Sequence, residues 1–367
     1  MVVTWAQALS WRLRRHLLDP VGTGSVAEVV RQLGPMPAWP EAAAEQAIGV
    51  RRSEGRAGDT ARALAAGDLV KVYAFRGATH LITPREAGAY LAVRASSRMW
   101  ELASWESYYR LTAADWPRFR AYVRAALADG PLTRSGLASA LGRSSRYRHL
   151  RSIVAEGNDT LLKPLTWQGD MGLGVSSDGE ATFLALDSVA GWAGIPDLDE
   201  AGPAVVAAYF RTHGPTTPDR VHDWFGKGLG ARRKDVARWL TRLEDRLAPV
   251  SAAGEPLMVL EEDLDELRST AASTSVRLLP GRDPWVMAPG TTDTHIVPPA
   301  HREVVSRSAN PVLAHGVVAG TWRVRGEQVE VTWFSDSGRV PRTALDREAT
   351  TLGRFLDRPL DLTVEVG

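Results

Sequence analysis

The stretches Gly130-Pro131-Leu132-Thr133 and Gly214-Pro215-Thr216-Thr217 open the same run of predicted elements twice in this chain. In each copy a threonine suited to helix capping leads into a short helix, a turn and a second helix rich in arginine. Two strands around a turn follow in both copies. A repeated unit of helices followed by a two-stranded wing predicts a winged-helix module in each copy.

The wing strands are predicted from short apolar runs bounded by turn residues. In the first copy they are Leu161 to Thr166 and Met171 to Val175, and in the second they are Leu247 to Val250 and Leu257 to Leu260. A third, divergent copy is predicted near the N-terminus, where Leu69 to Phe75 and Thr79 to Ile82 are joined by a turn at Arg76-Gly77.

Outside the wings, Thr4 and Ser25 are predicted to cap the first two helices, and a third helix is expected to begin near Glu41. A last helix is expected from about Arg342 to Phe355 among short strands. The predicted class is therefore α+β, with three tandem winged-helix modules, helical insertions and a C-terminal β-rich domain. The expected boundaries are 1–95 for the first winged helix, 96–190 for a helical segment with the second, 200–270 for the third and 276–367 for the C-terminal domain.

Composition narrows the classes of function. A formal net charge of +1 over 367 residues means that any contact with a polyanion must come from local basic patches. The chain has no cysteine and its histidines are not set at ligand spacing, so we expect neither a metal site nor a cofactor. We find no signal peptide and no apolar stretch near 18 residues, and we expect a monomeric cytoplasmic protein that does not enter a membrane.

Basic residues gather on or near the second helix of each repeat, which is the element that a winged helix presents to nucleic acid. An ordinary solvated helix face is the competing interpretation of the same charges. The residues that we predict to contact the DNA backbone are Arg143, Arg146, Arg148, Arg151, Arg232, Arg233 and Lys234.

Few residues suggest catalysis. No nucleophile with its base and no phosphate-binding glycine loop stands out. Glu41, Glu45 and Gln46 follow the proline-rich loop that ends at Pro40, where a carboxylate or amide can position a water molecule. Favourable charge at the start of a helix is their default role.

The chain resembles the AlkZ/YcaQ-type winged-helix DNA glycosylases in four segments that occur in the order of that family. These segments are Arg76 to His80 (RGATH), Gly214 to Thr217 with Trp224, Leu278 to Trp285 (LLPGRDPW) and Gly316 to Arg323 (GVVAGTWR). The resemblance implies tandem winged helices and a β-rich C-terminal part that form a concave surface for duplex DNA. It also implies excision of bulky alkylated purines, in DNA repair or in self-resistance of antibiotic producers.

The family carries its catalytic Gln-x-Gln or Gln-x-Asp motif in the loop after the second helix, and here that loop reads Pro37-Ala38-Trp39. Neither polar side chain of the motif is therefore present, and whether the protein is an enzyme stays open. Pro37 and Trp39, together with Arg76 and His80, are the candidates for binding substrate, with Trp39 suited to stacking on a base or a planar ligand.

Three functions remain open from the sequence. The first is recognition or hydrolytic excision of alkylated bases in double-stranded DNA, without a cofactor. The second is binding or conversion of a small aromatic metabolite, and it is motivated by the replaced motif. The third is a non-enzymatic winged-helix regulator.

Overall fold

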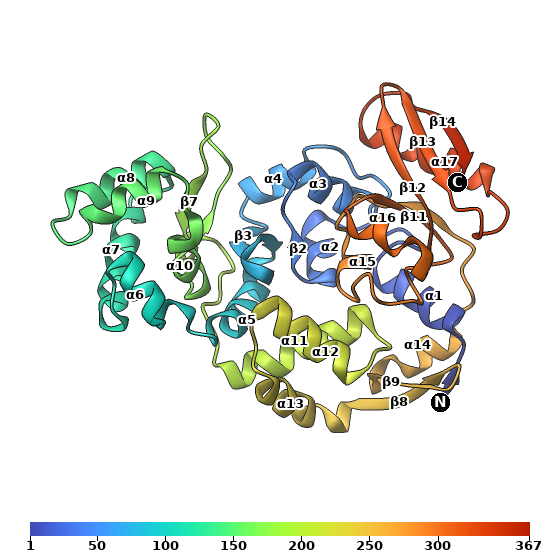
Figure 1. Ribbon diagram of the computed structural model, residues 1–367, viewed down its shortest axis with the longest axis horizontal. Helices are drawn as coiled ribbons and strands as arrows, with labels where there is room; N and C mark the ends of the chain where they lie inside the picture. Colours follow the sequence, from blue (N-terminus) through green and yellow to red (C-terminus); the bar gives the residue numbers. More distant parts are fainter. The chain divides into compact units, whose positions relative to one another are not determined.

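A computed structural model (Figure 1) describes all 367 residues of the chain. The residues form two compact units, each assembled from segments that are distant in sequence. Unit 1 contains residues 1–60, 206–224 and 240–367, and unit 2 contains residues 61–205 and 225–239. Both units combine helices with strands, which confirms the predicted α+β class. None of the helices has both the length and the apolar character that crossing a bilayer requires.

The N-terminal part of unit 1 consists of β1 (Val2–Val3), α1 (Trp5–Arg15), α2 (Val26–Leu33), β2 (Met36–Pro37) and α3 (Glu41–Gly49). The predicted caps are confirmed, because Thr4 Oγ1 accepts a hydrogen bond from Gln7 N at 3.1 Å and Ser25 Oγ accepts one from Glu28 N at 3.2 Å. Gly34, with φ of 79°, ends α2.

A five-stranded sheet forms the C-terminal part of unit 1. Its strands lie in the order β10 (Val276–Leu278), β11 (Asn310–Ala314), β12 (Val317–Arg325), β13 (Gln328–Trp333) and β14 (Asp361–Val366). Neighbours are antiparallel except β13 and β14, which are parallel and are connected through α17 (Arg342–Phe355). Helix α17 packs on β10 and β14 and has the bounds that the sequence predicts (Figure 1).

Unit 1 also holds a smaller sheet, in which β1 pairs in parallel with β8 (Leu247–Ala252) and β8 pairs with β9 (Glu255–Leu260). The two strands predicted for this wing are thus confirmed. The remaining helices wholly within unit 1 are α14 (Leu264–Ser269), α15 (Pro284–Met287) and α16 (Arg302–Ser306).

Unit 2 is built on an antiparallel sheet with the order β4 (Thr79–Ile82), β3 (Val70–Tyr73), β6 (Met171–Leu173), β7 (Thr182–Ala185) and β5 (Leu132–Thr133). Its helices are α5 (Pro84–Ala95), α6 (Ala103–Tyr109), α7 (Trp116–Leu127), α8 (Arg134–Arg143), α9 (Arg151–Ala155) and α10 (Lys163–Trp167). Three further helices contribute residues to both units, namely α11 (Leu198–His213), α12 (Pro218–Leu229) and α13 (Arg233–Arg242), and α4 (Asp59–Ala65) leads from unit 1 into unit 2.

One predicted strand is wrong. Residues Leu161 to Thr166 form a 3-10 turn and α10 instead, and the strand β6 pairs with β7 rather than with this segment. Pro164 stands in the first turn of α10, where its fixed φ suits a helix and its missing N–H costs nothing. The segment is buried on all sides, so its apolar run carries no periodicity that separates a strand from a buried helix. The boundaries expected for the single winged-helix modules stay a prediction.

Three of the four segments shared with the resembling family lie in unit 1, where side-chain hydrogen bonds fix them. Trp285 Nε1 donates to Gly316 O at 3.0 Å, and Trp322 Nε1 donates to Leu279 O at 2.8 Å, so two of the motifs bind each other. The buried Arg12 of α1 donates to the carbonyls of Gly214 and Pro215 at 3.3 and 3.2 Å. These indole and guanidinium groups satisfy buried carbonyls that have no partner in a helix or sheet.

An ion pair between Arg51 and Asp283 lies in the centre of unit 1. Both side chains are fully buried, and two parallel contacts of 2.7 and 2.6 Å join the guanidinium to the carboxylate. Arg51 also donates to the carbonyls of His16 and Ala47, and Asp283 accepts from Trp285 N. The pair therefore joins α1, α3 and the start of α15, three elements that are remote in sequence.

Two histidines lie beside this pair. His16 Nε2 and His213 Nδ1 are 3.2 Å apart, and both rings are buried. Burial lowers the pKa of His16 well below its ordinary value and lowers the pKa of His213 to about 3, and the positive charges of Arg12 and Arg51 act in the same direction. Both imidazoles are therefore neutral at pH 7.

Substitution Asp283→Ala is expected to lower the free energy of unfolding by about 3–5 kcal/mol, because it leaves Arg51 buried without a counter-charge. Replacing both partners by apolar side chains, as in Arg51→Met with Asp283→Leu, should cost less than the sum of the single changes. Urea denaturation followed by circular dichroism measures these differences. Glu330→Gln, at the exposed pair with Arg323, is the control and should change little. A loss for Asp283→Ala no larger than that of the control contradicts the prediction.

Acidification is expected to destabilise unit 1 through His16 and His213. In the unfolded chain each imidazole takes up a proton below roughly pH 6.5, whereas the depressed pKa values keep both neutral in the folded chain. The free energy of unfolding should thus fall by about 1 kcal/mol per histidine between pH 7 and 5.5. His213→Gln should remove one histidine's share of this slope in urea titrations, and a slope unchanged by the substitution would contradict the assignment.

Candidate functional site

The loop between α2 and α3 holds Pro37 and Trp39, the residues that the sequence predicts to stand where the family carries its motif. Met36 and Ala38 are buried and fix the loop, Pro37 is half-buried, and Trp39 is 65 % exposed. Pro40 then starts α3 without a side-chain cap. Proline has no side-chain donor or acceptor, and the indole of Trp39 has one donor only. Positions 37 and 39 therefore lack a group that accepts a proton from water, while Trp39 presents an aromatic surface.

The three catalytic candidates on α3 have different surroundings. Glu41 is exposed in the first turn. Glu45 accepts a hydrogen bond from Thr60 N at 2.9 Å and so holds the start of α4. Gln46 lines a pocket at the other end of the helix. Of the three, only Glu41 is an exposed carboxylate next to the loop.

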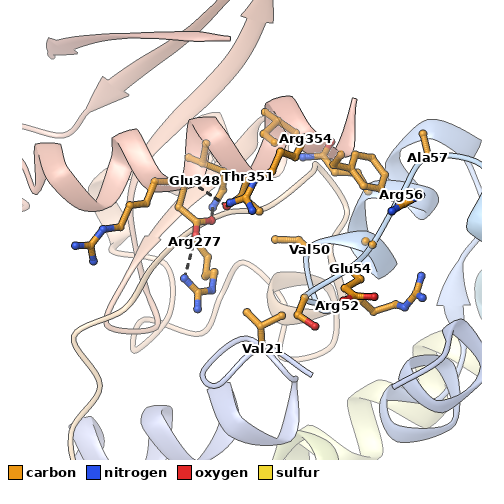
Figure 2. Close-up of a pocket in the computed structure, with 18 of the residues that line it drawn as sticks. Val21, Val50, Arg52, Glu54, Arg56, Ala57, Arg277, Glu348, Thr351 and Arg354 are labelled. Atoms are coloured by element: carbon orange, nitrogen blue, oxygen red, sulfur yellow. Dashed lines mark hydrogen bonds and ion pairs between the residues drawn. The ribbon is translucent and has the colours of Figure 1, made fainter. Parts of the chain in front are cut away.

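That pocket, called here the α3–α17 pocket, has a volume of about 990 Å³ and lies wholly within unit 1 (Figure 2). The end of α3 and the loop from Val50 to Ala57 form one wall, and β10 with α17 forms the other. Apolar side chains, among them Val50, Leu352 and Phe355, line part of it. Its charged lining consists of Arg52, Arg56, Arg277, Arg347 and Arg354 with Glu54, Glu348 and Asp357.

Close packing fixes the two walls of the pocket. A Cβ atom at Gly49 would lie 2.3 Å from the ring of Phe355, so only glycine allows this approach of α3 to α17. Ala57 N donates to Phe355 O at 3.4 Å. Arg52 donates a hydrogen bond to Gly24 O at 3.0 Å and forms an ion pair with Asp59. These two contacts fix the loop from Val50 to Ala57. The pocket is therefore already formed in the free protein.

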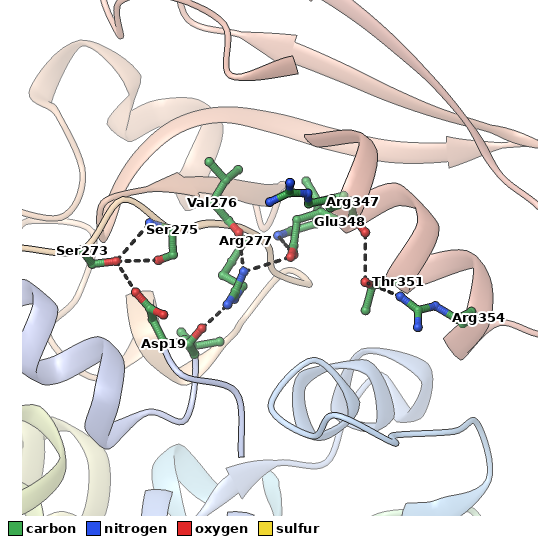
Figure 3. A network of polar contacts seen from close by, with 11 residues as sticks. Asp19, Ser273, Ser275, Val276, Arg277, Arg347, Glu348, Thr351 and Arg354 are labelled. Carbon is green, nitrogen blue, oxygen red and sulfur yellow. Dashed lines mark hydrogen bonds and ion pairs between the residues drawn. The ribbon is translucent and has the colours of Figure 1, made fainter. Parts of the chain in front are cut away.

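A polar network supports the α17 side of the pocket (Figure 3). Arg277 donates to Leu18 O at 2.6 Å and pairs with Glu348 at 3.0 Å. Glu348 also accepts from Leu278 N at 3.1 Å. Burial raises the pKa of Glu348, against the lowering effect of Arg277 and of the backbone contact. The pair is thus a positioning element that ties α17 to β10 and α1.

Arg76 and His80 belong to unit 2, on the hairpin of β3 and β4. Arg76 is exposed at the tip with φ of 53°. His80 is buried, its Nδ1 lies 3.0 Å from Ala78 O, and burial lowers its pKa to about 4. A neutral, buried ring that contacts its own hairpin is typical of a structural histidine. Of these two residues, only Arg76 has an exposed side chain.

The basic residues of the first repeat lie around the end of α8. Arg143, Arg148 and Arg151 are exposed, and Arg146 is exposed but paired with Asp115 at 2.5 Å. They lie on the last residue of α8, a turn and the start of α9, rather than along one long second helix. Arg232, Arg233 and Lys234 are exposed at the start of α13, and Arg232 pairs with Asp235 at 3.0 Å. Both clusters belong to unit 2.

The arginines of the α3–α17 pocket were missed in the sequence. Arg347 and Arg354 are seven residues apart on a helix that was predicted with its correct bounds, and this spacing places them on one face. Charges on one face of a helix are usually a solvated surface. The face of α17 that carries Arg347 and Arg354 becomes one wall of a pocket because α17 packs against the loop after α3.

Comparisons with known proteins extend over nearly the whole chain. The family model described as DNA glycosylase AlkZ-like matches residues 30–355. The interstrand DNA cross-link repair glycosylase of Streptomyces sahachiroi is 32% identical over 360 residues, which are 96% of this chain and 97% of the relative. The solved structure of Streptomyces sahachiroi DNA glycosylase AlkZ matches with a TM-score of 0.93 at 30% identity and covers 100% of both chains. All four segments that carry the resemblance lie within residues 30–355.

Proposed function

Because this chain belongs to the AlkZ-like DNA glycosylase family, we propose that it recognises bulky alkylated bases in duplex DNA. The similarity over the full length of a relative named for cross-link repair is the observation that carries this proposal. A relative whose name states action on cross-linked DNA supports a substrate with a bulky adduct. The protein would act in DNA repair or self-resistance in the cytoplasm.

Excision is proposed to be slow in comparison with members that carry the family motif. Hydrolysis of an N-glycosidic bond needs a water molecule held near the sugar and a group that stabilises developing positive charge. An alkylated purine is cationic and leaves readily, but Pro37 and Trp39 offer no acceptor for the water. Glu41, an exposed carboxylate in the first turn of α3 beside this loop, is the candidate for residual activity. The chemistry would be a monofunctional hydrolysis that uses only side chains of this protein.

Trp39 is proposed to bind the lesion by stacking. With 65 % of its surface exposed, the indole is available to a base, and such stacking contributes about 1–3 kcal/mol per base. A flipped or distorted alkylated nucleotide exposes the flat face that this contact needs. The replacement of an amide by tryptophan thus favours binding over hydrolysis.

Capture of a small aromatic metabolite is the second candidate, and the exposed indole of Trp39 is the feature that favours it. A compact aromatic ligand is best held by an enclosed apolar cavity. The pocket at the end of α3 is instead lined by five arginines. This charge favours a phosphate-bearing partner, and DNA remains the preferred substrate.

Purified protein incubated with duplex DNA containing an N7-alkylated guanine is expected to release free base at close to the spontaneous rate. Restoring the motif with Pro37→Gln and Trp39→Asp should raise release at least about tenfold, because the new carboxylate at position 39 can act as a general base, and a positioned general base contributes about 10²–10⁴. Chromatography of the released base measures both rates. Adding Glu41→Gln to the unmodified protein tests the residual activity. Rapid release by the unmodified protein would contradict slow excision while leaving lesion recognition intact.

Binding to duplex DNA is expected to weaken steeply with salt, because lysine and arginine contacts to phosphates release counterions. Arg143→Ala with Arg148→Ala should reduce the slope of log affinity against log salt by roughly 0.9 for each lost contact. Fluorescence anisotropy over a salt series measures this slope. The matched control is Arg85→Ala with Arg302→Ala, which removes two exposed charges from α5 and α16. Equal slopes for the two double variants would contradict the assignment of Arg143 and Arg148.

A further inference from the structure

We propose that the α3–α17 pocket is a phosphate-binding site, with Arg56, Arg347 and Arg354 as the groups that contact phosphate oxygens. The site lies outside every residue that the sequence predicts to bind DNA, and neither lesion recognition nor excision as described above uses it.

The charges are unequal, with five arginines and three carboxylates in the lining. Glu348 is committed to Arg277, and Arg52 is committed to Asp59. Arg56, Arg347 and Arg354 have no carboxylate partner. Glu54 and Asp357 form no ion pair and reduce the field of the pocket without cancelling it. The uncompensated positive charge therefore belongs to three guanidinium groups, whose fork of donors matches phosphate.

The spacing of these groups fits more than one phosphate. Arg347 and Arg354 are two turns apart on α17, which corresponds to roughly 10 Å along the helix axis. Arg56 comes from the loop that forms the other wall of the pocket (Figure 2). Figure 3 shows the side chains of Arg347 and Arg354 at separate places along α17. A chain of phosphates or phosphodiesters offers a separate phosphate to each of these groups, and it is the ligand class proposed for the pocket.

The backbone that carries Arg56 is fixed, whereas the side chains of Arg56, Arg347 and Arg354 are exposed. Thr351 Oγ1 donates a hydrogen bond to Arg347 O at 2.9 Å and accepts one from Arg354 Nη2 at 3.4 Å. Because threonine is neutral, this contact leaves the positive charge of Arg354 uncompensated. The loop with Arg56 is fixed by Arg52 and by Arg56 N, which donates to Asp59 Oδ2 at 3.0 Å. Val50, Leu352 and Phe355 supply an apolar wall for sugar or base atoms.

Two sources carry this chemistry, namely the backbone of a DNA strand and a free polyphosphate. The DNA source rests on the proposed function. Trp39 precedes the first residue of α3, and the pocket begins near its last turn, a separation of roughly 13 Å along nine residues. At about 3.4 Å per nucleotide this distance corresponds to roughly four nucleotides. A strand whose altered base stacks on Trp39 thus extends to the pocket with its flanking phosphates.

The test compares two double variants and two probes. Arg347→Ala with Arg354→Ala removes the proposed contacts, and Arg342→Ala with Arg358→Ala removes two exposed arginines near the ends of the same helix that do not line the pocket. Titration calorimetry with inorganic pyrophosphate tests the free anion, and anisotropy with a labelled duplex tests the strand. The pocket variant should lose about tenfold or more in affinity, and the control should not. Circular dichroism and thermal unfolding confirm that both variants are folded.

A substitution that removes a negative charge from the pocket is expected to have the opposite effect on affinity. Glu54→Gln removes a negative charge from the pocket wall and should strengthen binding of the same probe that the arginine variant weakens. A merely structural role of the arginines would not produce this gain. The two changes together therefore separate phosphate binding from a general effect on folding.

Each outcome has one meaning for the proposal. A loss specific to pyrophosphate supports the site with a free polyphosphate, and a loss specific to the duplex supports it with DNA. Equal affinities of the pocket and control variants for both probes would overturn it. Failure of the unmodified protein to bind duplex DNA would refute the proposed function, while pyrophosphate binding would still decide the pocket.

Discussion

The buried ion pair between Arg51 and Asp283 is the interaction on which unit 1 depends. Its partners are 232 residues apart, and both are fully excluded from water. An unpaired charge at this depth is costly, so the N-terminal helices and the segment before α15 must meet in one register. Trp285, Gly316 and Trp322 extend that constraint, because their hydrogen bonds join the two motif segments of the C-terminal part.

Helix α3 connects the buried ion pair to the two surfaces proposed to bind a ligand. Arg51, just beyond its C-terminal end, is fixed by Asp283, and Gly49 packs under Phe355 of α17. The same helix begins next to Trp39, whose side chain is left exposed. One short, rigid element thus separates an aromatic surface from an arginine-lined pocket. We propose that stacking by Trp39 takes the place of the chemistry that the family motif supplies.

Much of the fold was accessible from local patterns. Thr4, Ser25 and Thr133 accept capping hydrogen bonds because hydroxyl side chains satisfy free N–H groups at helix starts, and this chemistry is visible in sequence. Residues 161–166 were mistaken for a strand because a fully buried helix has no polar face to reveal its period. Of the predicted substrate contacts, Trp39 is exposed and His80 is buried in its hairpin, and which residues bind substrate stays a prediction.

The sequence by itself determined the helix caps, the α+β class and the family, because these depend on side-chain identity and short-range order. Only the tertiary structure decided that Glu45 is occupied by Thr60 and that Arg56, Arg347 and Arg354 line one pocket. The physical reason is that a charge acquires its role from the groups around it. Neighbours nearly 300 residues away in the chain are brought there by packing, which no local pattern specifies.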